Sequence, residues 1–121
     1  MKRVLVVDNE PHILKLVSFT LKARGYEVLE ASDGMAAVEL AVSERPDLIL
    51  MDVVMPVLSG YEAAGRLKDD PRTAHIPIVM LSAKSQPAER SEGLERGAHS
   101  YITKPFTPSE LVQHVTDLIG T

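Results

Sequence analysis

Polar side chains that could perform chemistry come directly after several short apolar runs of the sequence. They are Asp8, Asn9, Asp52, Ser82, Thr103 and Lys104. If each apolar run is a strand of one parallel sheet, the strands end at the same edge, where open α/β sheets bind their ligands. We therefore expect two carboxylates, an amide, a hydroxyl and an ammonium group around a single crevice.

This set of groups suits the transfer of a phosphoryl group. Two neighbouring carboxylates repel each other unless a cation or a proton intervenes, and Mg²⁺ is a hard cation that prefers oxygen ligands. A carboxylate can also attack phosphorus and form an acyl phosphate if the charge on the transferred oxygens is neutralised, which Mg²⁺, Lys104 and Ser82 can do. Asp52 is the expected acceptor because it ends the third apolar run, residues 48–51, which is typical of the sheet centre.

Each of these residues also has an ordinary structural explanation. Asp8 and Asn9 are of types that commonly cap helices. Asp52 can belong to a plain loop, Ser82 can begin a turn, and Lys104 can extend into solvent as most lysines do. For any one of them alone the structural explanation is preferred, but their coincidence at successive strand ends favours a shared site.

The elements that must position these residues follow from the periodicity. Short apolar runs alternate with longer amphipathic stretches, a pattern typical of a parallel sheet with helices on both faces. The runs predict strands at residues 2–7, 27–30, 48–51, 78–81 and 101–103. Helices are expected from Pro11 to Gly25, from Ser32 or Asp33 to Pro46, from Ser59 or Gly60 to Asp70, over 87–96, and from Thr107 to Gly120. The predicted fold is α/β, a flavodoxin-like (βα)5 three-layer sandwich; the order 2-1-3-4-5 suits it, although periodicity alone does not determine strand order.

Composition excludes several classes of function. The length of 121 residues fits one domain, expected to cover residues 1–121. The formal net charge of -4 repels nucleic acid and anionic lipid, so we expect no direct nucleic-acid binding. The sequence has no apolar stretch long enough to span a membrane, so we expect no membrane insertion. The absence of cysteine excludes disulfides, thiolate catalysis and cysteine-bound zinc. The first apolar run stops at Asp8, which is too early for a signal peptide, and a cytoplasmic location is expected.

Four segments together resemble one known family. They read VLVVDNEP (4–11), PDLILMDVVMPVLSG (46–60), PIVMLSAK (77–84) and GAHSYITKPF (97–106). In their order and spacing the chain resembles, over its full length, the response-regulator receiver domain of two-component signalling, which belongs to the CheY-like superfamily. Because four ordered segments match, the resemblance is far more specific than any single motif.

The resemblance implies a phosphorylation switch that works with Mg²⁺. Asp52 would accept a phosphoryl group from a phosphohistidine on a sensor histidine kinase or a phosphotransfer protein, or from a small acyl phosphate. Mg²⁺ would be held by Asp8, Asn9, the Asp52 carboxylate and the backbone carbonyl of Val54. The domain would catalyse only its own phosphorylation and dephosphorylation, and would not otherwise be an enzyme.

The resemblance also assigns the groups that bind and report the phosphate. Ser82, the backbone amide of Ala83 and the Lys104 ammonium would hold phosphoryl oxygens, and the family usually has a cis peptide bond at the place of Lys104–Pro105. Tyr101 matches the aromatic residue whose ring moves when the serine moves. Such a switch is a shift between two populated arrangements.

The implied output surface comprises helix 87–96, strand 101–103 and the last helix. It would act on a downstream output domain or protein, and a homodimer through the same surface is possible. The last helix contains no arginine, unlike that of the winged-helix transcription-factor subfamily.

The chain departs from the family pattern at Asn9, where the family most often has a second acidic residue. An amide oxygen can coordinate Mg²⁺, but the loss of one negative charge predicts weaker binding of the ion. An alternative function is therefore a pseudo-receiver, a protein-interaction module that acts without phosphorylation. A phosphatase that uses Asp52 as its nucleophile is a third possibility, but it would need an acid where Val54 stands.

Overall fold

The computed structural model describes residues 1–55, 57–82 and 98–120, and in this part of the chain it contains a five-stranded parallel sheet. The strands are β1 (Arg3–Val7), β2 (Glu27–Ala31), β3 (Leu48–Asp52), β4 (Ile78–Ser82) and β5 (Ser100–Thr103). Their order is β2-β1-β3-β4-β5, and all four neighbouring pairs are parallel, so the predicted fold class and strand order are confirmed. β3 and β4 each run one residue further than predicted, which makes Asp52 and Ser82 the last residues of their strands.

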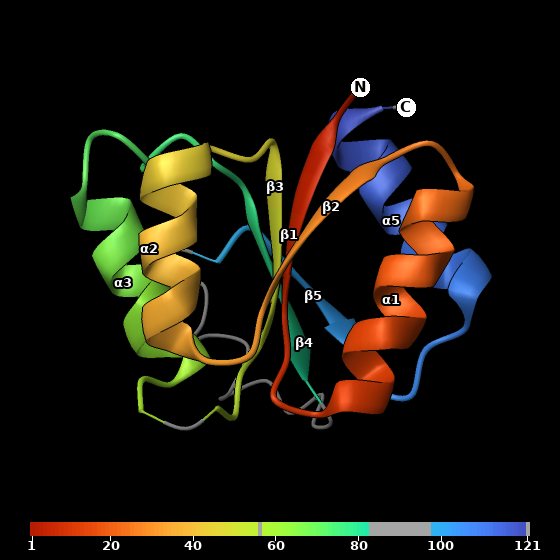
Figure 1. Cartoon of the computed structure of the whole chain (residues 1–121), viewed down its shortest axis with the longest axis horizontal. Coiled ribbons are helices and arrows are strands. Elements are labelled where there is room, and N and C mark those ends of the chain that lie inside the picture. Colours follow the sequence, from red (N-terminus) through yellow and green to blue (C-terminus); the bar gives the residue numbers. More distant parts are fainter. Residues whose placement is uncertain (56, 83–97, 121) are drawn as a thin grey trace.

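Helices cover both faces of the sheet, which gives the predicted three layers. α1 (Pro11–Ala23) and α5 (Pro108–Ile119) lie on one face, and α2 (Gly34–Glu44) and α3 (Gly60–Asp69) lie on the other (Figure 1). The helix predicted over 87–96 lies outside the described residues. Within the parts of the chain that are described, every helix is too short or too polar to span a membrane.

Polar side chains begin three of the helices at the predicted places. Asp33, rather than Ser32, caps α2 by accepting a hydrogen bond of 2.8 Å from the amide of Ala36. Ser59 and Glu62 form a capping box at the start of α3, and the Thr107 hydroxyl accepts from the first turn of α5. These bonds satisfy amides that a helix cannot pair internally. Each of these three helices therefore starts at a defined residue.

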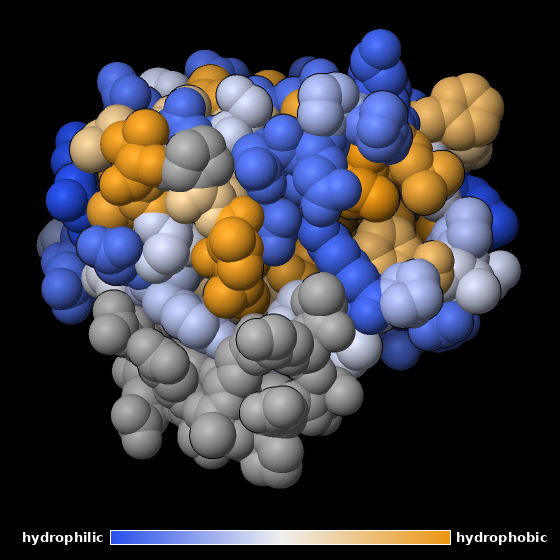
Figure 2. Space-filling model, turned by 90° about the horizontal axis from the view of Figure 1, so that it is seen from below, coloured by the Kyte–Doolittle hydropathy of each residue, from blue (hydrophilic) through white to orange (hydrophobic). Residues whose placement is uncertain are grey.

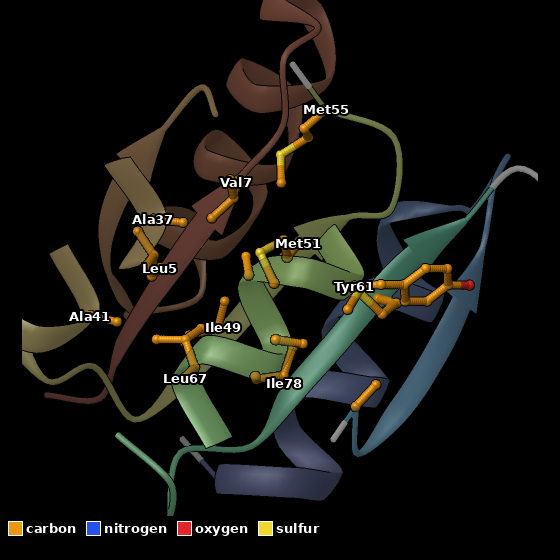
Figure 3. Close-up of a cluster of buried hydrophobic side chains, with 14 of the residues drawn as sticks. Leu5, Val7, Ala37, Ala41, Ile49, Met51, Met55, Tyr61, Leu67 and Ile78 are labelled. Atoms are coloured by element: carbon orange, nitrogen blue, oxygen red, sulfur yellow. The ribbon is translucent and has the colours of Figure 1, made fainter. Parts of the chain in front are cut away.

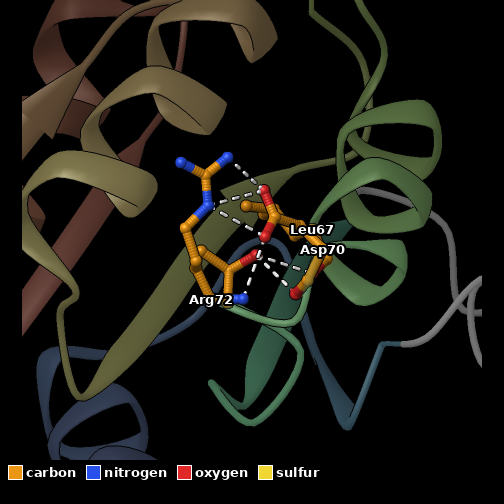
Figure 4. Close-up of polar contacts among 4 residues, drawn as sticks. Leu67, Asp70 and Arg72 are labelled. Carbon is orange, nitrogen blue, oxygen red and sulfur yellow. Dashed lines mark hydrogen bonds and ion pairs between the residues drawn. The ribbon is translucent and has the colours of Figure 1, made fainter.

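The end of α3 is shaped by a tight ion pair (Figure 4). The Arg72 guanidinium lies 2.8 Å from Asp70 and also donates through its Nε, and these hydrogen bonds hold the pKa of the Asp70 carboxyl at about 2. The Thr73 hydroxyl donates 2.7 Å back to the carbonyl of Leu67. This turn closes α3 near Asp70, as predicted, and leads the chain back to β4.

The core consists of two apolar clusters, one on each face of the sheet. β1, β3 and β4 supply side chains to both clusters because alternate residues of a strand point to opposite faces. Figure 3 shows part of the cluster that β1, β3 and β4 share with α2 and α3. α3 starts so close to β3 that a Cβ atom on Gly60 would lie 2.3 Å from the Asp52 carbonyl oxygen. The first turn of α3 therefore rests directly on the backbone of Asp52.

Candidate functional site

Three of the predicted polar residues meet at the edge where the strands end. The Lys104 ammonium nitrogen lies 3.0 Å from Asp8 Oδ2 and 3.2 Å from Asp52 Oδ2. All three side chains are largely withdrawn from solvent, with exposed fractions of 13%, 0% and 9% for Lys104, Asp8 and Asp52. Lys104 is thus a cation shared by two buried carboxylates. This agrees with the prediction that the strand ends bring these groups together around one crevice.

Short backbone contacts hold these residues at the ends of their strands. The Asp8 amide donates 3.2 Å to the carbonyl of Ala31 on β2, and the Lys104 amide donates 2.7 Å to the carbonyl of Ser82 on β4. The peptide bond between Lys104 and Pro105 is cis, which confirms the expectation for this position. Neighbouring strands therefore fasten the two loops that bring Asp8 and Lys104 to Asp52.

The Asp8 and Asp52 carboxylates also accept hydrogen bonds from their own loops. Asp8 Oδ1 accepts 2.9 Å from the amide of Glu10, and Asp52 Oδ1 accepts 3.2 Å from the amide of Val54. Glu10 is the N-cap residue of α1, and its side chain makes no capping bond. The simple explanation that Asp8 or Asn9 is the N-cap of the first helix is therefore wrong.

Burial and mutual charge determine the ionisation of this group. Burial raises the pKa of the Asp52 carboxyl; Lys104 opposes this rise, and the neighbouring charge of Asp8 adds to it. Burial acts against the charge of Lys104, but its bonds to Asp8 and Asp52 outweigh burial and raise the pKa of the ammonium group. Lys104 therefore stays protonated, and its charge offsets the repulsion between the two carboxylates when no other cation is bound.

A third carboxylate, that of Glu10, adjoins the pair. One carboxylate oxygen from each of Asp8, Glu10 and Asp52 lies within 4.8 Å of the other two, and Glu10 Oε1 is 3.9 Å from the Lys104 nitrogen. Glu10 is not among the site residues predicted from the sequence, although its position two residues after Asp8, just beyond a strand end, is a signal that could have indicated it. Three oxygen donors of this kind fit a hard divalent cation such as Mg²⁺.

The remaining predicted residues lie around this centre in different ways. Ser82 is buried at the end of β4, whereas Asn9 is exposed in the loop after β1. Val54 lies two residues after Asp52 and is 76% exposed. Tyr101 is half-buried on β5, and Ala83 lies outside the described residues. Seen from the edge where the strands end, hydrophobic side chains lie beside hydrophilic ones on the surface (Figure 2).

The fold and the site together define a class of protein: a three-layer α/β domain with an acidic pocket at the carboxyl ends of its strands. Residues 4–116 match the sequence profile of the response regulator receiver domain. The chain therefore belongs to the response regulator receiver domain family. Receiver domains are signalling domains rather than enzymes in the usual sense, they bind Mg²⁺ in an acidic pocket, and they interact with histidine kinases and output domains.

Individual relatives agree with this assignment. The phosphate regulon transcriptional regulatory protein PhoB of Pseudomonas aeruginosa is 48% identical over 111 residues, which are 92% of this chain and 48% of PhoB. The chemotaxis response regulator CheY4 of Vibrio cholerae is 36% identical, with a TM-score of 0.94 and 98% of both chains covered. The receiver domain of the sensor histidine kinase PA1611 of P. aeruginosa, solved with a magnesium ion in its active site cleft, is 32% identical with a TM-score of 0.91; 99% of this chain and 98% of that chain are covered.

The first curated relatives are longer than the chain. It spans about half the length of PhoB, and also about half the length of the DNA-binding transcriptional regulator RpaA of Synechocystis.

Proposed function

We propose that residues 1–121 form one phosphoacceptor receiver domain that takes a phosphoryl group on Asp52 with the help of Mg²⁺. One observation carries the proposal: the buried Asp52 carboxylate lies 3.2 Å from the nitrogen of a protonated lysine, Lys104, which it shares with the carboxylate of Asp8. A carboxylate in this position can act as a nucleophile while its neighbours neutralise the incoming charge.

The residues of the chain define the transfer step. One Asp52 carboxylate oxygen attacks phosphorus, an oxygen–phosphorus bond forms, and the nitrogen–phosphorus bond of a phosphohistidine breaks, after which the released imidazole takes up a proton from solvent. Lys104 is close enough to Asp52 to pair with an oxygen of the transferred group. Ser82, buried at the end of the neighbouring strand, and the Ala83 amide would bind the other oxygens.

The same pocket would hold the metal ion. Asp8, Glu10 and Asp52 would supply carboxylate oxygens, and the Asn9 amide and the Val54 carbonyl, in the loops after β1 and β3, would be further donors. When bound, Mg²⁺ would neutralise charge on the phosphoryl oxygens and relieve the repulsion between the carboxylates. The magnesium ion in the cleft of the PA1611 receiver domain supports this proposal.

The proposed partners follow from the family. The phosphate donor would be a sensor histidine kinase or a phosphotransfer protein in the cytoplasm. Phosphorylation would shift Tyr101 and the surface formed by residues 87–96, β5 and α5, and so control an output domain or protein. A homodimer through this surface is part of the same proposal, and residues 87–96 lie outside the described part of the chain.

Intact-protein mass spectrometry after incubation with acetyl phosphate and Mg²⁺ tests the proposal. We expect the wild-type chain to gain the mass of one phosphoryl group and Asp52→Asn to gain nothing. A wild-type chain that stays unmodified with acetyl phosphate and with a panel of phosphorylated histidine kinases would overturn it. That result would favour the pseudo-receiver, a second candidate that the neutral Asn9 supports.

A further inference from the structure

The proposed switch residue Tyr101 is bonded to a tyrosine of a different element. The Tyr101 hydroxyl donates a hydrogen bond of 3.1 Å to the hydroxyl of Tyr61, in the first turn of α3. Tyr61 is 8% exposed, and its ring reaches from α3 across β4 toward β5 (Figure 3). Both rings pack in the same apolar cluster. The position of one phenol therefore restricts the position of the other.

Tyr61 is itself held against the phosphoacceptor. The preceding residue, Gly60, donates its amide to the carbonyl of Val53 at 2.9 Å. A Cβ atom on Gly60 would overlap the Asp52 carbonyl, and the capping box of Ser59 fixes the same turn. The start of α3 can therefore move only together with the backbone at Asp52.

We propose that Tyr61 is a positioning residue for the switch: its hydroxyl holds the Tyr101 ring in the half-buried arrangement, and it links that ring to Asp52 through the first turn of α3. This route is separate from the one through Ser82 that the family resemblance implies. The effect of Tyr61 on the ring stands on the geometry alone, whereas its role in signalling rests on the proposed function. A coupling of this kind requires an element with two arrangements that both ends can bias, and the Tyr101 ring is that element.

Removing the Tyr61 hydroxyl tests the first half of the proposal. We expect Tyr61→Phe to change the ratio of the Tyr101 ring arrangements about fivefold, the effect of one ordinary hydrogen bond. The ratio can be measured by nuclear magnetic resonance of the labelled Tyr101 ring in the unphosphorylated protein. Tyr26→Phe is the matched control, because it also removes a tyrosine hydroxyl that donates a hydrogen bond, in this case to the Gly120 carbonyl. Tyr26 packs in the cluster on the opposite face of the sheet. A Tyr101 ratio that Tyr61→Phe changes no more than Tyr26→Phe does would refute the positioning role.

A double-mutant cycle provides a second measurement that does not depend on resolving the ring signals. The unfolding free energies of Tyr61→Phe, Tyr101→Phe and the double variant should be non-additive, because both single changes remove the same bond. Additive values would also refute the positioning role.

The second half of the proposal is tested with acetyl phosphate and Mg²⁺. We expect the Tyr101 signals of the wild type to shift on phosphorylation, and the shift in Tyr61→Phe to be clearly smaller than in Tyr26→Phe. Equal shifts in the two variants would refute the link to Asp52. If the wild type is not phosphorylated at all, the proposed function fails, and the unphosphorylated measurements still decide whether Tyr61 positions Tyr101.

Discussion

Substitution of Glu10 by glutamine should weaken Mg²⁺ binding, because it removes one of three carboxylates from the acidic pocket. The ligand oxygens of this cluster lie within 4.8 Å of one another, and the Glu10 side chain is 57% exposed. An ion held among these oxygens lies no farther than about 4.8 Å from Glu10, and at that outer limit, in a water-like dielectric, a divalent cation and a carboxylate attract each other by about 1.7 kcal/mol. Screening by physiological salt lowers this to about 1 kcal/mol. We therefore expect the affinity of Glu10→Gln for Mg²⁺ to be about five- to twentyfold lower.

The same reasoning predicts the opposite effect at the neighbouring position. Asn9→Asp adds a carboxylate to the same loop, so it should bind Mg²⁺ more tightly than the wild type. Equal affinities of these two proteins would refute the idea that the neutral Asn9 weakens the site.

Isothermal titration of Mg²⁺ into the wild type, Glu10→Gln, Asn9→Asp and a control variant measures these effects. Glu30→Gln is the matched control: Glu30 is exposed near the end of β2, at the same edge of the sheet, and its oxygens are not part of the cluster. The reasoning fails if Glu10→Gln binds as tightly as the wild type. It also fails if Glu30→Gln loses as much affinity, since net charge alone would then explain the result.

Three further predictions concern stability. The His114 ring shares a hydrogen bond of 2.7 Å with the Ser100 hydroxyl, and burial lowers the pKa of the ring from 6.5. As pH falls below about 6.5 the unfolded chain binds a proton before the folded chain does, so the wild type should lose stability relative to His114→Gln. Denaturant unfolding curves of the two proteins that change in parallel with pH would contradict this. Lys104→Met leaves two buried carboxylates without their shared cation and should cost about 3 kcal/mol in metal-free buffer, with part of the loss recovered in Mg²⁺. Thermal melts that show no recovery in Mg²⁺ would count against a metal between the carboxylates. Gly60→Ala should destabilise the domain by about 2 kcal/mol, because the added Cβ overlaps the β3 backbone. Gly65→Ala, with open space around it in the same helix, should stabilise the domain by about 1 kcal/mol. If chemical denaturation gives both changes the same sign, the close contact between α3 and β3 does not restrict the residue at position 60.

Local patterns in the sequence were sufficient to predict most of the architecture. The continuous apolar runs of the central strands and the amphipathic stretches between them predict a parallel sheet with helices on both faces, because only strands buried on both sides lack polar residues. Ser59 and Thr107 could be predicted as helix caps, since capping involves only the next few residues.

The sequence was less informative where neighbouring residues of similar type compete. Ser32 and Asp33 were equal candidates for the cap of α2, and the structure chose Asp33. Residue type alone makes Asp8 or Asn9 a plausible cap of the first helix, whereas in the structure Asp8 accepts a hydrogen bond from the Glu10 amide and binds Lys104. Such choices depend on the direction in which a side chain points, which the order of residue types does not contain.

By itself, then, the sequence determined the family, the order of the secondary-structure elements and the residues that follow each strand, because all of these depend on short-range patterns and on motifs that can be recognised one at a time. Only the tertiary structure decided that Glu10 joins Asp8 and Asp52, that Lys104 bridges both aspartates, and that Tyr61 bonds to Tyr101. These contacts join residues that are up to 96 positions apart, and they exist only where parallel strands and the first turn of α3 end side by side.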